Sequence, residues 1–155
     1  MTKRTASCRC GQLTATCTGE PVRVSVCHCL ACQQRSGTAF AAQARWASEE
    51  VEVTGEASVW ERVADSGHRV TCRFCPVCGS TVAYTIEGWP GVTAIPYGAF
   101  AGTEMPAPGF SVYEDRRHAW VEITGVVARS TSTSAARKPG LDLLSSRASP
   151  QDPET

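Results

Sequence analysis

The chain has 155 residues, of which 42% are hydrophobic, and its 15 basic side chains balance 15 acidic ones. This length suits one domain with its own hydrophobic core, and the lack of a basic excess argues against a nucleic-acid partner. No segment has the length and apolarity of a membrane span, and the N-terminal MTKRTASCRC lacks the apolar run of a signal peptide. We therefore expect a cytoplasmic protein with no membrane partner, in a compartment that keeps thiols reduced.

Short β-favouring runs separated by turn residues follow one another along the first 124 residues. The predicted strands cover 13–18, 22–27, 39–46, 57–63, 68–74, 80–86, 92–100 and 118–123. One short helix is expected in LACQQRS, directly after Cys29, and Gly37 would end it. The pattern predicts a mainly β domain over 1–124, built from antiparallel sheets with one short helix and stabilised by metal.

The composition changes near residue 125. Residues 125–155 are rich in Ser, Thr, Ala and Pro and contain no aromatic residue. Such a segment buries too little apolar surface to offset the entropy of ordering it. We expect a disordered tail there, with no role in chemistry.

The nine cysteines are the most informative residues of the sequence. Seven of them form three tight clusters, which are Cys8-x-Cys10, Cys27-x-Cys29-x-x-Cys32 and Cys75-x-x-Cys78. Because a reducing compartment disfavours disulfides, we interpret these clusters as metal ligands.

Two of the clusters form a natural pair. Cys75-x-x-Cys78, followed by Gly79, is a zinc half-site that needs a second pair of ligands, and Cys8-x-Cys10, followed by Gly11, can supply it. A zinc ion held by these four cysteines would join the first strand to the middle of the domain. Such a structural zinc contributes on the order of 10 kcal/mol to folding.

The third cluster is then left with three cysteines. Side chains alternate along an extended chain, so Cys27 and Cys29 face one side and His28 the other, and Cys32 can turn back onto the same metal. Three protein ligands and a vacant position are the arrangement of catalytic zinc. Cys72, Cys17 or His118 could instead complete a closed site, and the protein would then be purely structural. Cys17 and Cys72 also follow strand alternation, which is typical of buried thiols.

The segments CRCGQLTATCTGEP, CHCLACQQRSGTAF and FCPVCGSTVAY, with HAWVEI after them, resemble the glutathione-dependent formaldehyde-activating enzyme (GFA) family. Centromere protein V shares this domain, and the resemblance covers residues 5–123. It implies a β-tent fold with two zinc ions. Its structural zinc would be held by Cys8, Cys10, Cys75 and Cys78, and its second zinc by Cys27, Cys29 and Cys32. The founding activity joins glutathione and formaldehyde into S-hydroxymethylglutathione, formally a carbon–sulfur lyase reaction in reverse.

Two further side chains are candidates for the open site. Arg35 could offset the negative charge of three thiolates or hold a carboxylate of glutathione, and its alternative is a solvated cation at a helix end. His118 and Trp120 match the closing His-x-Trp element of the family, with both side chains on one face of a last strand. His118 could then act as an acid, a base or a hydrogen-bond donor, or be a core histidine.

The leading hypothesis is a zinc-dependent carbon–sulfur lyase-type enzyme acting on a thiol, glutathione in the first place, and a small aldehyde such as formaldehyde. An incoming thiol would take the vacant zinc position as a thiolate. One alternative is a non-catalytic zinc module that binds a protein or nucleic-acid partner. The other is a thiol or metal sensor that gains and loses the second zinc.

Overall fold

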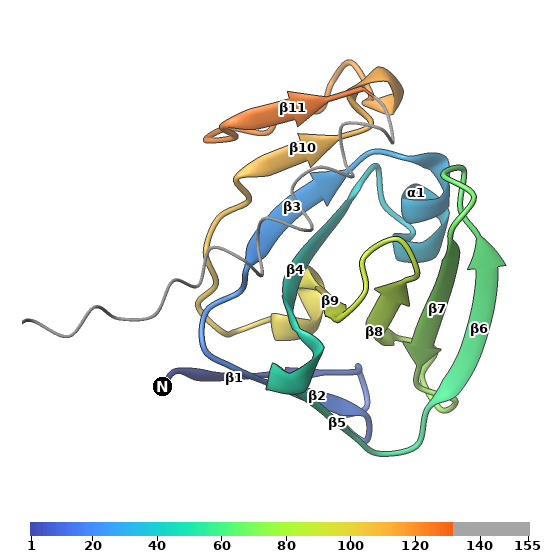
Figure 1. Ribbon diagram of the computed structural model, residues 1–155, viewed down its shortest axis with the longest axis vertical. Helices are drawn as coiled ribbons and strands as arrows, with labels where there is room; N and C mark the ends of the chain where they lie inside the picture. Colours follow the sequence, from blue (N-terminus) through green and yellow to red (C-terminus); the bar gives the residue numbers. More distant parts are fainter. Residues whose placement is uncertain (132–155) are drawn as a thin grey trace, which may run out of the picture.

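The computed structural model describes residues 1–131 of the chain, and this part is mainly β (Figure 1). One α-helix, α1 (Leu30–Ser36), is accompanied by 3-10 turns at Ser48–Glu50, Tyr97–Phe100 and Glu114–Arg116. The strands in this part are β1 (Lys3–Ser7), β2 (Thr14–Thr18), β3 (Arg23–Cys27), β4 (Ala41–Ala47), β5 (Val51–Thr54), β6 (Ser58–Val63), β7 (Arg69–Phe74), β8 (Thr81–Ile86), β9 (Val92–Pro96), β10 (Phe110–Val112) and β11 (Ala128–Ser130).

The strands form two sheets. The smaller sheet has the order β1-β2-β5, and the larger one has the order β11-β10-β3-β4-β9-β8-β7-β6. Most neighbours are antiparallel, as the sequence predicts, but β10 runs parallel to both β3 and β11. The larger sheet curls from β11 at the top of Figure 1 to β6 at its right, and the smaller sheet lies below it.

The core is the layer between the two sheets. The small sheet contributes Ala6 and Ala15, the bend before β2 contributes Leu13, and the large sheet contributes Trp46 and Ile95, all of them fully buried. The ring of Trp46 packs against the ring of Phe100, with 5.5 Å between the ring centroids. This packing leaves the opposite face of the large sheet free to form a site.

Helix α1 forms where the sequence predicts it. Cys29 is its N-cap, and its Sγ accepts a hydrogen bond from the backbone N–H of Cys32 at 3.3 Å. Gly37 ends the helix in the left-handed region (φ 68°) and donates its N–H to the carbonyl of Gln33 at 2.9 Å.

The predicted strand at 118–123 is wrong. Within the described residues, the position beside β3 is taken by β10 and then by β11, so the segment after the 3-10 turn at Glu114–Arg116 has no strand to pair with. The segment is irregular, Trp120 is 75% exposed, and the ring of His118 stacks on it at 5.6 Å. The predicted strand 92–100 is also shorter, because the chain turns into a 3-10 helix after Pro96.

Four strands are present that the sequence analysis does not predict, namely β1, β5, β10 and β11. Among them, β11 carries the ordered sheet past residue 124, because Ala128–Ser130 pairs with β10 along the edge. The rest of the predicted tail, 132–155, lies outside the described residues.

Candidate metal centre and pocket

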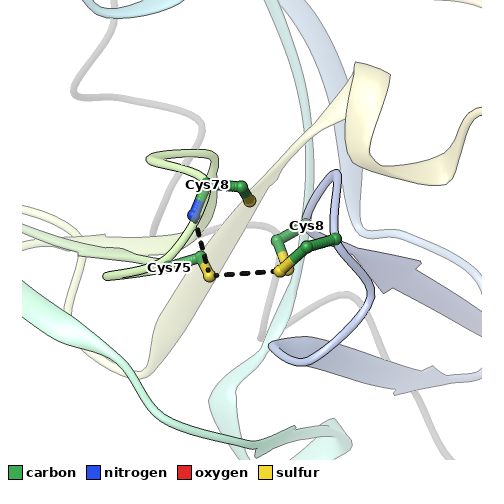
Figure 2. A group of neighbouring side chains, drawn as sticks. Cys8, Cys75 and Cys78 are labelled. Carbon is green, nitrogen blue, oxygen red and sulfur yellow. Dashed lines mark hydrogen bonds between the residues drawn. The ribbon is translucent and has the colours of Figure 1, made fainter.

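The first cysteine cluster joins two turns that are far apart in the sequence. Cys8 and Cys10 lie in the turn after β1, and Cys75 and Cys78 lie in the turn between β7 and β8. Their four Sγ atoms all lie within 4.8 Å of one another, and Figure 2 shows Cys8, Cys75 and Cys78 converging from the two turns. The structure therefore brings together the four residues that the sequence pairs.

The spacing of the sulfur atoms fits zinc. The Sγ of Cys10 lies 3.5 Å from that of Cys8 and 3.6 Å from that of Cys75. A tetrahedral zinc with bonds of about 2.3 Å places its sulfur ligands roughly 3.8 Å apart, whereas a disulfide needs about 2.05 Å. All nine cysteines are free thiols. The group could thus hold zinc as a closed four-cysteine site.

Backbone geometry prepares this cluster for a cation. Gly11 and Gly79, which follow the two cysteine pairs, have positive φ angles of 85° and 77°, a conformation that glycine adopts without strain. The chain can therefore turn back under the sulfur atoms. The backbone N–H groups of Val77 and Cys78 then point at the Sγ of Cys75, at 3.4 and 3.5 Å.

These contacts favour thiolates. Burial by itself raises the pKa of Cys75, but hydrogen bonds from the Gln12 side chain (2.9 Å) and from the turn amides outweigh it and lower the pKa. Hydrogen bonds with Ser80 lower the pKa of Cys78 to about 5. Deprotonated sulfur is the form that binds metal.

The second cluster lies at the junction of β3 and α1. Cys27 ends β3, Cys29 caps α1 and Cys32 lies in its first turn, and their Sγ atoms are within 4.8 Å of one another. In the described part of the chain, no fourth cysteine, histidine or carboxylate belongs to this group. The donor set fits zinc with three ligands and one position left to a ligand from outside.

His28 faces away from this cluster, as strand alternation predicts. It is fully buried, and its Nε2 lies 3.0 Å from the hydroxyl of Ser111. The other candidate fourth ligands do not belong to the group either. Cys17 belongs to the core between the sheets, and Cys72 packs with Val70 and Tyr84.

The three thiols of the second cluster differ in the direction of their pKa shifts. Hydrogen bonds from Cys27 and Cys29, aided by the charge of Arg35, lower the pKa of Cys32 to about 3. The pKa of Cys27 is raised, because its proton is held in hydrogen bonds with Cys29 and Cys32 and because the thiol is buried. The cluster therefore carries at least one thiolate near neutral pH.

A pocket of about 120 Å³ opens at this cluster, on the face of the large sheet that points away from the small sheet. All three cysteines line it, together with Arg35 and Tyr84. The guanidinium of Arg35 lies 4.8 Å from the centre of the Tyr84 ring, and its Nη2 is buried without a hydrogen-bond partner. Arg35 is thus a pocket residue next to the cluster, not a solvated cation at a helix end.

His118 is not among the residues that line the pocket. Its Nε2 lies 2.9 Å from the Oε1 of Gln33 on α1, and the Nε2 of Gln33 in turn donates to the carbonyl of His28 at 2.8 Å. His118 is therefore connected to the region of the cluster through Gln33 and the backbone of His28.

The sequence analysis missed the polar residues at the other end of the pocket. Arg23, Ser25, Gln43 and Arg45 all line it, and each is less than 10% exposed. A signal was present, because Arg23, Ser25 and Cys27 alternate along one strand and must share a face. Polar residues on that face are usually assigned to solvent, and only the fold shows that β10 and the 88–89 turn enclose them.

The chain was compared with known proteins. Residues 3–116 match the family model described as glutathione-dependent formaldehyde-activating enzyme. Among solved structures, a crystal structure of a Rhodobacter sphaeroides protein from a structural genomics programme aligns with a TM-score of 0.48 and 18% identity, over 64% of this chain and 90% of that one. No curated protein matches the chain.

Within residues 1–131, no helix is long and apolar enough to cross a membrane. The family model spans most of the chain, and all three cysteine clusters lie within the matched residues. The chain therefore belongs to the family of the glutathione-dependent formaldehyde-activating enzymes.

Proposed function

We propose that the protein is a zinc-dependent carbon–sulfur lyase-type enzyme that joins a thiol, glutathione in the first place, to formaldehyde or another small aldehyde. The observation that carries this proposal is the group of Cys27, Cys29 and Cys32, which converge at a pocket without a fourth ligand among the described residues. Family membership supports the same reaction class.

The reaction needs no redox partner. The thiol loses its proton, its sulfur forms a bond to the carbonyl carbon, and the carbonyl oxygen takes up a proton to become the hydroxyl of the adduct. Zinc bound by the three cysteines would supply Lewis acidity and favour the thiolate form of an incoming thiol.

The chain's own residues bind and orient the reactants. Three thiolates and one Zn²⁺ have a net charge of minus one, and Arg35 beside Cys32 offsets it. The pocket wall of Val70, Tyr84 and Ile86 limits the access of water to the reacting sulfur. Because the reaction requires reduced cysteines, we propose a cytoplasmic location as well.

Exchange spectroscopy tests this function. In a solution of glutathione, formaldehyde and their adduct, the zinc-loaded protein should increase the exchange rate measured by NMR, and Cys32→Ala should abolish the increase. A matched control is Cys17→Ala, which removes a buried thiol from the core between the sheets. An exchange rate equal to that of the uncatalysed mixture would reject the proposal for this aldehyde.

A sensor function is the second candidate, because the low pKa of Cys32 and its partial exposure are typical of reactive cysteines. A sensor would release zinc from the second cluster when exposed to mild oxidant and rebind it after reduction. If the protein accelerates the exchange measured by NMR, the sensor function is not needed to explain the three-cysteine cluster.

A further inference from the structure

Two arginines lie together at the end of the pocket opposite the cysteines. Arg23 on β3 and Arg45 on β4 are cross-strand partners, and they are only 5% and 7% exposed. Both line the pocket together with Ser25 and Gln43, the cross-strand pair next along the two strands. Buried arginines are uncommon unless a carboxylate or another acceptor pairs with them.

Neither guanidinium has a carboxylate partner in residues 1–131. Arg4, Arg117 and Arg129 each pair with a glutamate, but no ion pair is formed by Arg23 or Arg45 in this part of the chain. The Nε and Nη1 atoms of Arg23 are buried without any hydrogen-bond partner. The Nε2 of Gln43 donates to the hydroxyl of Ser25 at 3.0 Å. Arg45 donates one bond, from Nη1 to the hydroxyl of Ser25 at 2.7 Å.

Aromatic rings lie over the flat faces of the guanidiniums. The Cζ of Arg23 lies 4.0 Å from the centre of the Phe110 ring, and the Cζ of Arg45 lies 4.7 Å from the centre of the Trp89 ring. The hydrogen-bond donors of a guanidinium point outward from its edge, in a fork that matches a carboxylate. Burial in the first place, and the nearby charge of Arg45 in the second, lower the pKa of Arg23 to about 10.

We propose that Arg23 and Arg45, together with Ser25 and Gln43, form a subsite for a carboxylate of the ligand whose thiol is held at Cys27, Cys29 and Cys32. The link of this subsite to the thiol ligand rests on the proposed function, whereas the binding of a carboxylate there does not. No residue of this subsite belongs to the cysteine clusters.

The distance between the two ends sets the kind of ligand. Arg23 and Cys27 are four residues apart on one extended strand, so their Cα atoms are separated by about 13 Å. Tyr84 lines the same pocket, and its pKa is affected by charges at both ends, those of Arg45 and of Cys32. A ligand that reaches both ends has its thiol and its carboxylate several bonds apart, as in a small peptide. A compact thiol without a carboxylate cannot use the subsite.

Glutarate, a carboxylate without a thiol, tests the subsite without any chemistry at the zinc. We expect glutarate to shift the NMR signal of the Trp89 indole in the wild-type protein, and Arg23→Gln and Arg45→Gln to weaken its binding by about tenfold or more. Arg73→Gln removes the same charge from an exposed position outside the pocket and should bind glutarate like the wild type. The wild-type titration stands on its own should either pocket variant fail to fold.

The outcomes are distinct. The absence of a Trp89 shift in the wild type, or equal glutarate affinity in Arg45→Gln, would overturn the subsite, and tighter binding of inorganic phosphate than of glutarate would overturn its assignment to a carboxylate. For the zinc-loaded protein, Arg45→Gln should weaken the binding of glutathione and leave the binding of 2-mercaptoethanol unchanged. An equal loss of affinity for both thiols would show that the subsite does not bind the carboxylate of the thiol ligand. Glutarate binding combined with failure of the exchange test would reject the proposed reaction and retain the subsite.

Discussion

At the scale of single residues, Cys72 is the cysteine most able to change the chemistry of the second cluster. It lines the same pocket, and it is buried to 3% exposure beside Val70 and Tyr84. Burial raises its pKa, although the charge of Arg35 acts in the opposite direction. A thiol that keeps its proton in an apolar wall is a packing residue, and this separates Cys72 from Cys32 despite their common pocket.

Zinc content measures this difference. We expect about two zinc ions per chain in the wild-type protein, about one in Cys32→Ala, and about two in Cys72→Ala. Cys32→Ala should stay folded, and Cys72→Ala should lose about 1–2 kcal/mol of stability through the small cavity it leaves. Atomic emission of the dialysed proteins gives the counts. Loss of one zinc from Cys72→Ala would show that the second site is closed, which would remove the basis of the proposed reaction.

At the scale of elements, the four-cysteine cluster connects the two sheets. Cys8 and Cys10 follow β1 of the small sheet, and Cys75 and Cys78 follow β7 of the large sheet. The strands themselves are short, and β1 and β5 have few buried side chains to hold them in place. A zinc ion held by this cluster would therefore supply a connection that apolar packing alone provides only in part.

Cys78→Ala tests this connection. Removing one of the four ligands should release the structural zinc and lower the melting temperature far more than Cys32→Ala does, because binding at such a site contributes on the order of 10 kcal/mol to folding. Thermal melts followed by circular dichroism, with zinc content measured in parallel, compare the two variants. Equal melting temperatures for Cys78→Ala and the wild type would show that packing of Trp46 and Phe100 holds the sheets together without the metal.

The elements also show how far the sequence alone could lead. The cysteine clusters, their glycines and α1 were predictable because ligand spacing and helix caps are local properties of the chain. Strand β5 alternates as a strand should but is only four residues long, and β10 and β11 pair in parallel with partners distant in the sequence. HAWVEI has the composition of a strand, but in the described part of the chain it has no neighbouring strand to pair with. The role of Arg23 and Arg45 depends on which strands flank β3, and that is a property of the fold.

At the scale of the whole molecule, the large sheet separates the two cysteine clusters. Cys8 and Cys75 belong to the core on one face, and the pocket with Cys27 and Cys72 lies on the other. Each cluster draws its ligands from its own turns and shares no residue with the other. Metal ions held by the two clusters would therefore respond independently to the same change in conditions.

Removal of zinc by a chelator should consequently occur in two steps. The three-cysteine cluster opens into a pocket and has one ligand fewer, so we expect its zinc to leave first, with no change in the far-ultraviolet circular dichroism. The zinc of the four-cysteine cluster should leave only at higher chelator concentration and together with unfolding, since this site is closed and its binding energy is part of the folding energy. A colorimetric chelator reports both releases while the spectrum is recorded. In Cys32→Ala only the second step should remain, and release of both ions from the wild-type protein in one transition with unfolding would contradict the independence of the two sites.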